Sequence, residues 1–366
     1  MHAEPLANAV NEVNEVNEVN EVNEVNEVDE ANEVNEQWRA NDPRFKNELG
    51  PNFRRLRAAY LQEAKESAEH FDSKAAAIRE SLKMFPGTTA IGADDFHFLL
   101  LAKLPDNALE QLGLVFKKMA IGNLTLPLQV LLNLLCLLGK KTGGSRVIAI
   151  MCSFYRCLMK ANGIAIREWD LQHGHKYDSA LAGCSSLQAA MLRALKIENG
   201  AAMMQECALL AWDMDKFYDS IDFGIFAEEI IKGNFPPELM ILGTLAHQAP
   251  RILKVETCIS EPIESTGNSI LAGCQCSVSF ARGLLWDLMD ALIHAIPRNP
   301  CHQHVDDLAQ PLVAKSPLAL RDKIVKAGTI VGQEVERLKI NLSDKSVVVP
   351  ISAVTLRAAY DLSKLK

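Results

Sequence analysis

Four aspartates lie in the stretch WDMDKFYDSID, residues 212–222. Asp215, Asp219 and Asp222 follow one another at i, i+4 and i+7, so in a helix they would share one face. This spacing is typical of a solvated helix start, where carboxylates also favour the positive end of the helix dipole. Asp213 does not belong to that pattern, because it ends a mostly apolar stretch that predicts a buried strand. A carboxylate at a strand end can bind a divalent cation if a second carboxylate joins it.

A second pair of carboxylates is found in the stretch CHQHVDDLAQPLV, residues 301–313. Asp306 and Asp307 lie between two short strand-like segments, which predicts a tight β-turn that carries two carboxylates side by side. Hard cations prefer oxygen ligands. A strand-end aspartate together with such a turn is therefore the layout that holds two divalent cations for nucleotidyl transfer.

The segment GKKTGGSRVIAIM, residues 139–151, predicts a β-hairpin, because a Gly-Gly turn separates a polar arm from a β-branched one. This hairpin would place Lys140 and Lys141 on one arm and Arg146 at the start of the other. The apolar run before it, residues 124–138, is interrupted by polar residues and is short for a bilayer span. It predicts a buried helix, and we expect no membrane partner.

The N-terminus repeats the triplet Val-Asn-Glu over residues 10–36. A three-residue period matches neither the 3.6-residue turn of a helix nor the two-residue repeat of a strand, so no face can be buried and disorder is predicted. The first 36 residues hold eleven acidic residues and no Lys or Arg, which leaves 38 basic and 35 acidic residues elsewhere. That balance permits a polyanionic partner without requiring one.

The chain has nine cysteines, an odd number, and its first residues lack the pattern of a secretion signal. We therefore expect a reducing, intracellular compartment, with nucleus and cytoplasm not distinguished. Cys274 and Cys276, together with Cys301, His302 and His304, could be considered as zinc ligands, but a one-residue gap between paired cysteines is poor for zinc. We expect no structural zinc and interpret the cysteines as buried thiols.

Six segments follow one another along the chain: AIGADDFHFLLLAKLPDNALEQLGLVFKKM, KKTGGSRVIAI, GHKYDSALAGCSSLQAAMLRAL, DMDKFYDSID, HVDDLAQ and RLKINLSDKS. In this order they resemble the reverse transcriptase domain of non-LTR retrotransposons and group II introns. The second is similar to the fingers hairpin of that family, the fourth to its first catalytic motif, and the fifth to its [F/Y]xDD motif. Ordered agreement over about 270 residues is far less expected by chance than one short motif.

The resemblance implies an α+β fold with the fingers and palm of a right-hand polymerase. The palm would be an antiparallel sheet with helices packed on one face, and the chain would end without the family's thumb. Five parts are expected: a disordered Val-Asn-Glu tract (1–37), an N-terminal helical extension (38–88), a fingers-like region (89–206), a palm with the catalytic aspartates (207–350) and a C-terminal tail (351–366).

The activity implied is RNA-directed DNA polymerase, which extends a DNA primer on an RNA template with deoxynucleoside triphosphates. Asp213 and Asp306 would bridge two Mg²⁺ ions, with Asp307 beside them and the carbonyl of Met214 as a further ligand. Lys345 stands where the family has a lysine associated with protonation of the leaving pyrophosphate.

The nucleotide would be held by a second group of residues that the resemblance assigns. Arg146, with Lys140 or Lys141, would contact the β and γ phosphates, for which guanidinium and ammonium groups are suited. Tyr218 stands at the steric-gate position, where its ring would clash with a ribose 2′-OH. Gln275 lies in the segment that grips template and nucleotide in the family.

Two positions depart from the family pattern. Cys276 stands in place of a glycine that lets backbone approach the nucleotide closely, and His304 in place of an aromatic residue. These departures keep a second hypothesis open, in which the chain is a catalytically inactive reverse-transcriptase-like scaffold that binds nucleic acid or protein.

Overall fold

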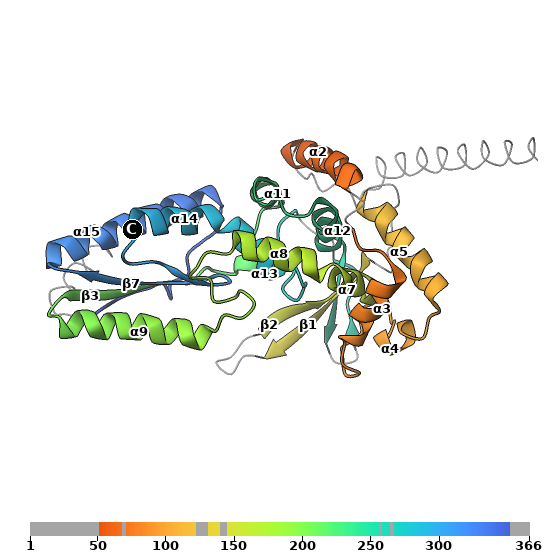
Figure 1. Ribbon diagram of the computed structural model, residues 1–366, viewed down its shortest axis with the longest axis horizontal. Coiled ribbons are helices and arrows are strands. Elements are labelled where there is room, and N and C mark those ends of the chain that lie inside the picture. The colour runs from red at the N-terminus through yellow and green to blue at the C-terminus, as the bar shows by residue number, and fades with distance from the viewer. Residues whose placement is uncertain are drawn as a thin grey trace, which may run out of the picture. The chain divides into compact units, whose positions relative to one another are not determined.

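The computed structural model describes residues 51–67, 71–121, 131–139, 145–255, 258–263 and 267–351 (Figure 1). Within these ranges the chain has thirteen helices and two four-stranded sheets, which confirms the α+β class. The Val-Asn-Glu tract and the tail after residue 351 lie outside the described residues. No helix in the described ranges is long and apolar enough to cross a membrane.

In the part of the chain that the structure describes, four helices precede the first strand: α2 (Pro51–Ser67), α3 (Ala75–Lys83), α4 (Phe98–Leu101) and α5 (Asp106–Ala120). The first of them packs on α11 (Phe223–Lys232) and α12 (Pro237–Gln248). Its buried Tyr60 donates a hydrogen bond to the carbonyl of Phe235. Helix α2 therefore shares the main core, whereas the buried side chains of α3 and α4 belong to a second, smaller core cluster that includes Leu109 and Cys157.

The N-terminal sheet has the strand order β2-β1-β4-β5. Its strands are β1 (Asn133–Gly139), β2 (Ser145–Ile150), β4 (Arg251–Val255) and β5 (Cys258–Ile259). Antiparallel pairing of β1 with β2 confirms the predicted hairpin, whose turn lies outside the described residues. The prediction of a buried helix over residues 124–138 is wrong for the part from Asn133 onward, which pairs with β2 on one side and with β4 on the other.

The C-terminal sheet has the order β6-β7-β3-β8 and is antiparallel throughout. Its strands are β3 (Glu206–Trp212), β6 (His302–His304), β7 (Asp307–Ala314) and β8 (Val347–Pro350). Figure 1 shows α15 (Pro317–Arg337) on one face and α9 (Ser186–Ala202) on the other, so the expectation of helices on one face only is wrong. The close packing of α9 on the sheet depends on Gly200. A Cβ atom at this position would lie 2.7 Å from the Cys207 Sγ in β3, so only glycine lets the helix approach the strand this closely.

The remaining described helices are α7 (Ser153–Ala161), α8 (Gly163–His173), α10 (Phe217–Ser220), α13 (Ser277–Leu284) and α14 (Trp286–Ala295), of which α7 packs on α3 and α14 on α15. The aspartate-rich stretch does not form one helix. Asp219 lies in the short α10, and Asp222 caps α11 by accepting from Gly224 N at 2.8 Å and Ile225 N at 3.1 Å. Because the helix breaks at Ile221, Asp215, Asp219 and Asp222 do not share the helix face that their spacing suggested.

Candidate active site

Asp213 follows directly after β3, where the chain leaves the C-terminal sheet, as the sequence predicts. Both its backbone groups are held by the segment before β8. Ser346 Oγ lies 3.1 Å from the Asp213 amide and 3.1 Å from its carbonyl, and the Ser343 amide donates to the same carbonyl at 2.8 Å. The main chain is therefore fixed from one side, and the carboxylate remains partly exposed.

Asp306 lies in a two-residue turn between β6 and β7, because His304 and Asp307 form the last pair of this hairpin. The predicted turn is thus confirmed. Val305 has a φ of 60°, in the left-handed region where a β-branched side chain is strained. Glycine or asparagine would form the same turn at lower cost. The Gln303 side chain donates to the Val305 carbonyl at 2.9 Å and holds the strained residue in place. Strain kept in this way is characteristic of functional sites.

The register of the sheet brings the two sets of carboxylates together. The last ladder pair between β3 and β7 is Trp212 with Leu308, and one step further Asp213 and Asp307 follow on the two strands. Residues opposite each other in an antiparallel pair share a face and lie about 5 Å apart. Burial raises the pKa of Asp306, and the negative charges of Asp307 and Asp213 raise it further. Asp213, Asp306 and Asp307 therefore form one group, called here the carboxylate cluster.

Met214 lies two residues beyond the end of β3 and forms an isolated β-bridge with Leu342. The flanking backbone bonds run from the Asp215 amide to the Asn341 carbonyl and from the Ser343 amide to the Asp213 carbonyl, each 2.8 Å long. Backbone groups alternate in direction along a strand, so the Met214 carbonyl points away from this segment and toward the side of β7. It is therefore directed to the side on which Asp306 and Asp307 lie.

Two of the expected nucleotide-binding residues lie at the cluster. The Lys345 ammonium lies 3.9 Å from the Asp213 carboxylate, on a side chain that is 84% exposed. Tyr218 is half-buried in α10, and its pKa is raised by burial first and then by the negative charge of Asp306. The phenol and Asp306 are thus close enough to interact electrostatically.

The other expected residues are not brought to the carboxylates by any contact among the described residues. Arg146 is exposed at the start of β2, and Lys140 and Lys141 lie outside the described residues. Gln275 is exposed, and its side chain donates to the Met159 carbonyl at 3.3 Å. The neighbouring Cys276 is fully buried, with its Sγ 3.8 Å from the Met159 sulfur. Its side chain therefore turns into the core and does not narrow the surface next to Gln275.

A buried ion-pair network behind the turn was not predicted from the sequence. Arg282 is 2% exposed; its Nε donates to the Asp178 carboxylate at 2.6 Å, and it also bonds to Asp170. The backbone of Asp178 in turn forms an isolated parallel β-bridge with Gln303 in β6, next to the strained turn. The only available signal was an arginine inside the apolar run SVSFARGLLW, since a buried arginine needs an acidic partner. Nothing in the sequence identifies which acids these are.

The hydroxyl of Ser179 adds a second link between β6 and the loop that joins α8 to α9. It donates to the Gln303 carbonyl at 3.0 Å and lies 3.1 Å from the His304 Nδ1. The His304 side chain, which precedes the turn, is thus within hydrogen-bond distance of the Ser179 hydroxyl. The loop, the network and the hairpin form a support for Asp306.

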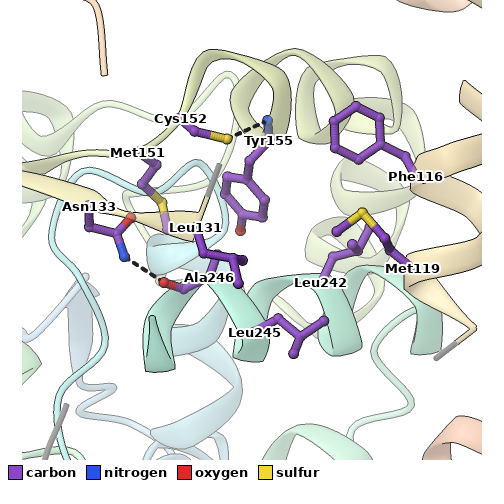
Figure 2. A pocket seen from close by; sticks show the side chains of 10 residues that line it. All are labelled: Phe116, Met119, Leu131, Asn133, Met151, Cys152, Tyr155, Leu242, Leu245 and Ala246. Carbon is purple, nitrogen blue, oxygen red and sulfur yellow. Dashed lines mark hydrogen bonds between the residues drawn. The ribbon is translucent and has the colours of Figure 1, made fainter. Parts of the chain in front are cut away.

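A small cavity shares no lining residue with the carboxylate cluster (Figure 2). It is lined mainly by apolar side chains such as Phe116, Met119 and Leu242, and its volume is about 10 Å³. That is room for one water molecule at most. The side-chain amide of Asn133, which also lines the cavity, donates a hydrogen bond to the Ala246 carbonyl at 2.7 Å.

The carboxylate cluster suits a hard cation such as Mg²⁺, because it offers oxygen ligands whose mutual repulsion a cation would relieve. Among the described residues no three His, Cys, Asp or Glu side chains are gathered into a ready-made metal centre. Mg²⁺ typically binds through one or two carboxylates plus substrate phosphates, so a complete protein cage is not required.

The sequence matches no protein-family model, and no curated protein matches it.

Proposed function

We propose that this chain is an RNA-directed DNA polymerase, in which the C-terminal sheet serves as the palm and the N-terminal sheet with its hairpin as the fingers. One observation carries the proposal: Asp213 and the Asp306–Asp307 turn meet at one end of neighbouring strands, with the pKa of Asp306 raised by burial and by the two other carboxylates. Carboxylates whose pKa is raised by burial and by neighbouring carboxylates are concentrated at functional sites. Crowding of this kind is expected where the carboxylates share a cation.

Asp213, Asp306 and Asp307 would hold Mg²⁺, with the Met214 carbonyl as a further oxygen ligand. When bound, the metal lowers the pKa of the attacking hydroxyl and neutralises charge on the transferred phosphate. The chain itself would position the metal ligands. Ser343 and Ser346 fix the backbone of Asp213, and the strained turn at Val305 fixes Asp306. Lys345 would supply a proton to the departing pyrophosphate, since its ammonium lies beside Asp213.

The proposed substrates are a DNA primer on an RNA template and deoxynucleoside triphosphates. Tyr218 would lie under the sugar of the incoming nucleotide and exclude a 2′-hydroxyl. Arg146, together with Lys140 or Lys141, would close over the triphosphate from the N-terminal sheet. Gln275 would contact the nucleotide from the surface above the buried Cys276, which leaves that approach open.

Primer extension with Mg²⁺ on an RNA template tests the proposal. We expect the full chain to extend a labelled DNA primer, and Asp213→Asn or Asp306→Asn to reduce extension at least about 10²-fold, the cost of losing one group that stabilises developing charge. Asp215→Asn is the matched control, because Asp215 is exposed in the same stretch and should keep its activity. Equal extension by wild type and Asp306→Asn would disprove the assigned role. A folded wild type that binds primer and template without extending them would favour the inactive scaffold.

A further inference from the structure

A second cavity lies at the outer side of the C-terminal sheet, between the end of α14, the loop that follows it and the first half of α15. Its volume is about 320 Å³, and it opens broadly to solvent. Its lining residues, which define what we call the basic cavity, are Ala295, Ile296, Pro297, Arg298, Asn299, Asp322, Lys323 and Lys326. The carboxylate cluster contributes nothing to it.

Cations dominate this cavity. Arg298, Lys323 and Lys326 belong to its lining, and Asp322 is the one acid among the described lining residues. From α9, Lys196 reaches the same loop and donates to the Arg298 carbonyl. Arg193 lies one helical turn before Lys196 on α9. The lining of the cavity thus has an excess of positive charge, with three cations and one acid.

The ammonium groups are held in place by carbonyl oxygens. Lys323 donates to the Asn299 side chain at 2.7 Å and to the Val313 carbonyl at 2.6 Å, and Lys326 donates to the Ala295 carbonyl at 3.0 Å. These partners carry no charge, so they fix the lysines without neutralising them. A set of cations positioned in advance lowers the entropic cost of binding an anion.

The cations also act on one another. Burial lowers the pKa of Lys196, and the charge of Lys323 lowers it further; the pKa of Lys323 is lowered by burial and by Arg298. The pKa of His302, at the start of β6, falls to about 4 through burial and the charges of Arg193 and Lys196. A bound anion would relieve this repulsion.

We propose that the basic cavity binds phosphate groups of a nucleic-acid strand. The cations come from α9, from the loop after α14 and from α15, and the cavity is open to solvent, so they do not enclose one small anion. No aromatic side chain is present among the lining residues, so bases would not be stacked and recognition would be of the backbone. This contact is additional to the proposed polymerase site and does not depend on catalysis by the carboxylates.

The test is binding of a fluorescent single-stranded RNA to the full chain, measured by anisotropy at several salt concentrations. We expect Arg298→Glu with Lys326→Glu to weaken binding at least about tenfold and to reduce the slope of log Kd against log salt by about 1.4, or 0.7 per lost phosphate contact. Both side chains are exposed, so folding should be unaffected, as thermal melting checks. Arg321→Glu is the matched control, since Arg321 is exposed on α15 but does not line the cavity.

Two further measurements identify the ligand. Inorganic phosphate should compete with the RNA only at concentrations far above the Kd of the RNA, and vesicles of phosphatidylcholine with phosphatidylserine should not bind in a way that depends on Arg298 and Lys326. Equal loss of binding in Arg321→Glu, an unchanged Kd in the double variant, or preference for phosphate or vesicles over RNA would each overturn the proposal. Asp213→Asn should keep this salt-dependent binding while it loses primer extension, which separates failure of this site from failure of the proposed function.

Discussion

The ammonium of Lys345 lies 3.9 Å from the carboxylate of Asp213, across the gap between the end of β3 and the start of β8. The lysine side chain is 84% exposed, and ion pairs at that exposure contribute little to folding. Stability therefore does not explain why the chain brings this cation to the carboxylate cluster. Its position beside a group of repelling carboxylates fits a role in chemistry.

Lys345→Ala should separate activity from stability. We expect the rate of nucleotide addition to fall about 10²-fold, the lower end of what a positioned general acid contributes. The free energy of unfolding should change by no more than about 0.5 kcal/mol, as for other exposed positions. Single-turnover primer extension and urea unfolding measure the two quantities.

Lys345→Arg shows whether Lys345 acts through its proton or only through its charge. The guanidinium keeps the positive charge but does not give up a proton, so the rate of Lys345→Arg should match that of Lys345→Ala if Lys345 is an acid. Lys103→Ala is the control, because Lys103 is exposed in another part of the chain and should leave the rate unchanged. A rate in Lys345→Ala equal to that of the control would refute the assigned role.

Asp306→Asn should stabilise the folded chain at neutral pH while it removes activity. The folded-state pKa of Asp306 is raised, so folding favours the protonated form. The stability contributed by that proton is fully present below the unfolded-state value of about 4 and is lost as pH rises through the folded pKa. The neutral amide avoids this loss. The variant should therefore melt at a higher temperature than wild type at pH 8, and the difference should vanish near pH 4.

The sign of the change in melting temperature shows whether the charge of Asp306 is repelled by the neighbouring carboxylates or stabilises the turn. If Asp306 held the turn through favourable contacts of its charge, Asp306→Asn would lower the melting temperature at pH 8 instead. Asp215→Asn provides the reference, since Asp215 is exposed and the substitution removes one negative charge from the same stretch.

Tyr218→Ala should increase incorporation of ribonucleotides relative to deoxyribonucleotides, because the ring would no longer lie where a 2′-hydroxyl projects. Loss of one steric contact in a binding pocket changes discrimination by about 10 to 200-fold. Tyr218→Phe is the matched control: it keeps the ring and removes the hydroxyl that interacts with Asp306. Competition between the two nucleotide types in primer extension gives the ratio. Equal sugar discrimination in the Ala and Phe variants would remove Tyr218 from the nucleotide site.

The elements next to the carboxylates could be predicted because their signals are local. An apolar stretch that ends at Asp213 predicts a strand, and two aspartates between short strand-like segments predict the turn at Asp306; both are present. The antiparallel pairing that ends at Gly139 and Ser145 agrees with the hairpin predicted from the Gly-Gly dipeptide, which itself lies outside the described residues. In each case the residues that decide the structure are neighbours in the sequence.

The errors come from interactions between distant segments. An apolar run does not distinguish a buried strand from a buried helix by periodicity, and β1 is a strand because β2 and β4 flank it. The carboxylates at i, i+4 and i+7 predicted one helix face, but the chain turns at Ile221 and Asp222 becomes an N-cap. The contact of Asp170 and Asp178 with Arg282 likewise depends on how α8 and α13 pack.

Arg282 provides the test of that packing. Its guanidinium is buried between two carboxylates, and Asp178 connects it to Gln303 in the strand before the Asp306 turn. Arg282→Met should lower the free energy of unfolding by about 3–5 kcal/mol, because it leaves buried carboxylates without a counter-charge. Lys83→Met is the control: it breaks an exposed ion pair with Glu80 and should cost no more than about 1 kcal/mol. Urea unfolding measures both.

A compensated variant shows whether the cost lies in the uncompensated charge or in lost packing. Arg282→Met combined with Asp170→Asn and Asp178→Asn keeps the volume of the site and removes all three charges, so most of the lost stability should return. Retained destabilisation would instead indicate that the hydrogen bonds of Asp178 to the loop matter more than its charge. In that case the turn that carries Asp306 should also be less ordered, and amide hydrogen exchange at Gln303 and Val305 should be faster in the compensated variant than in wild type.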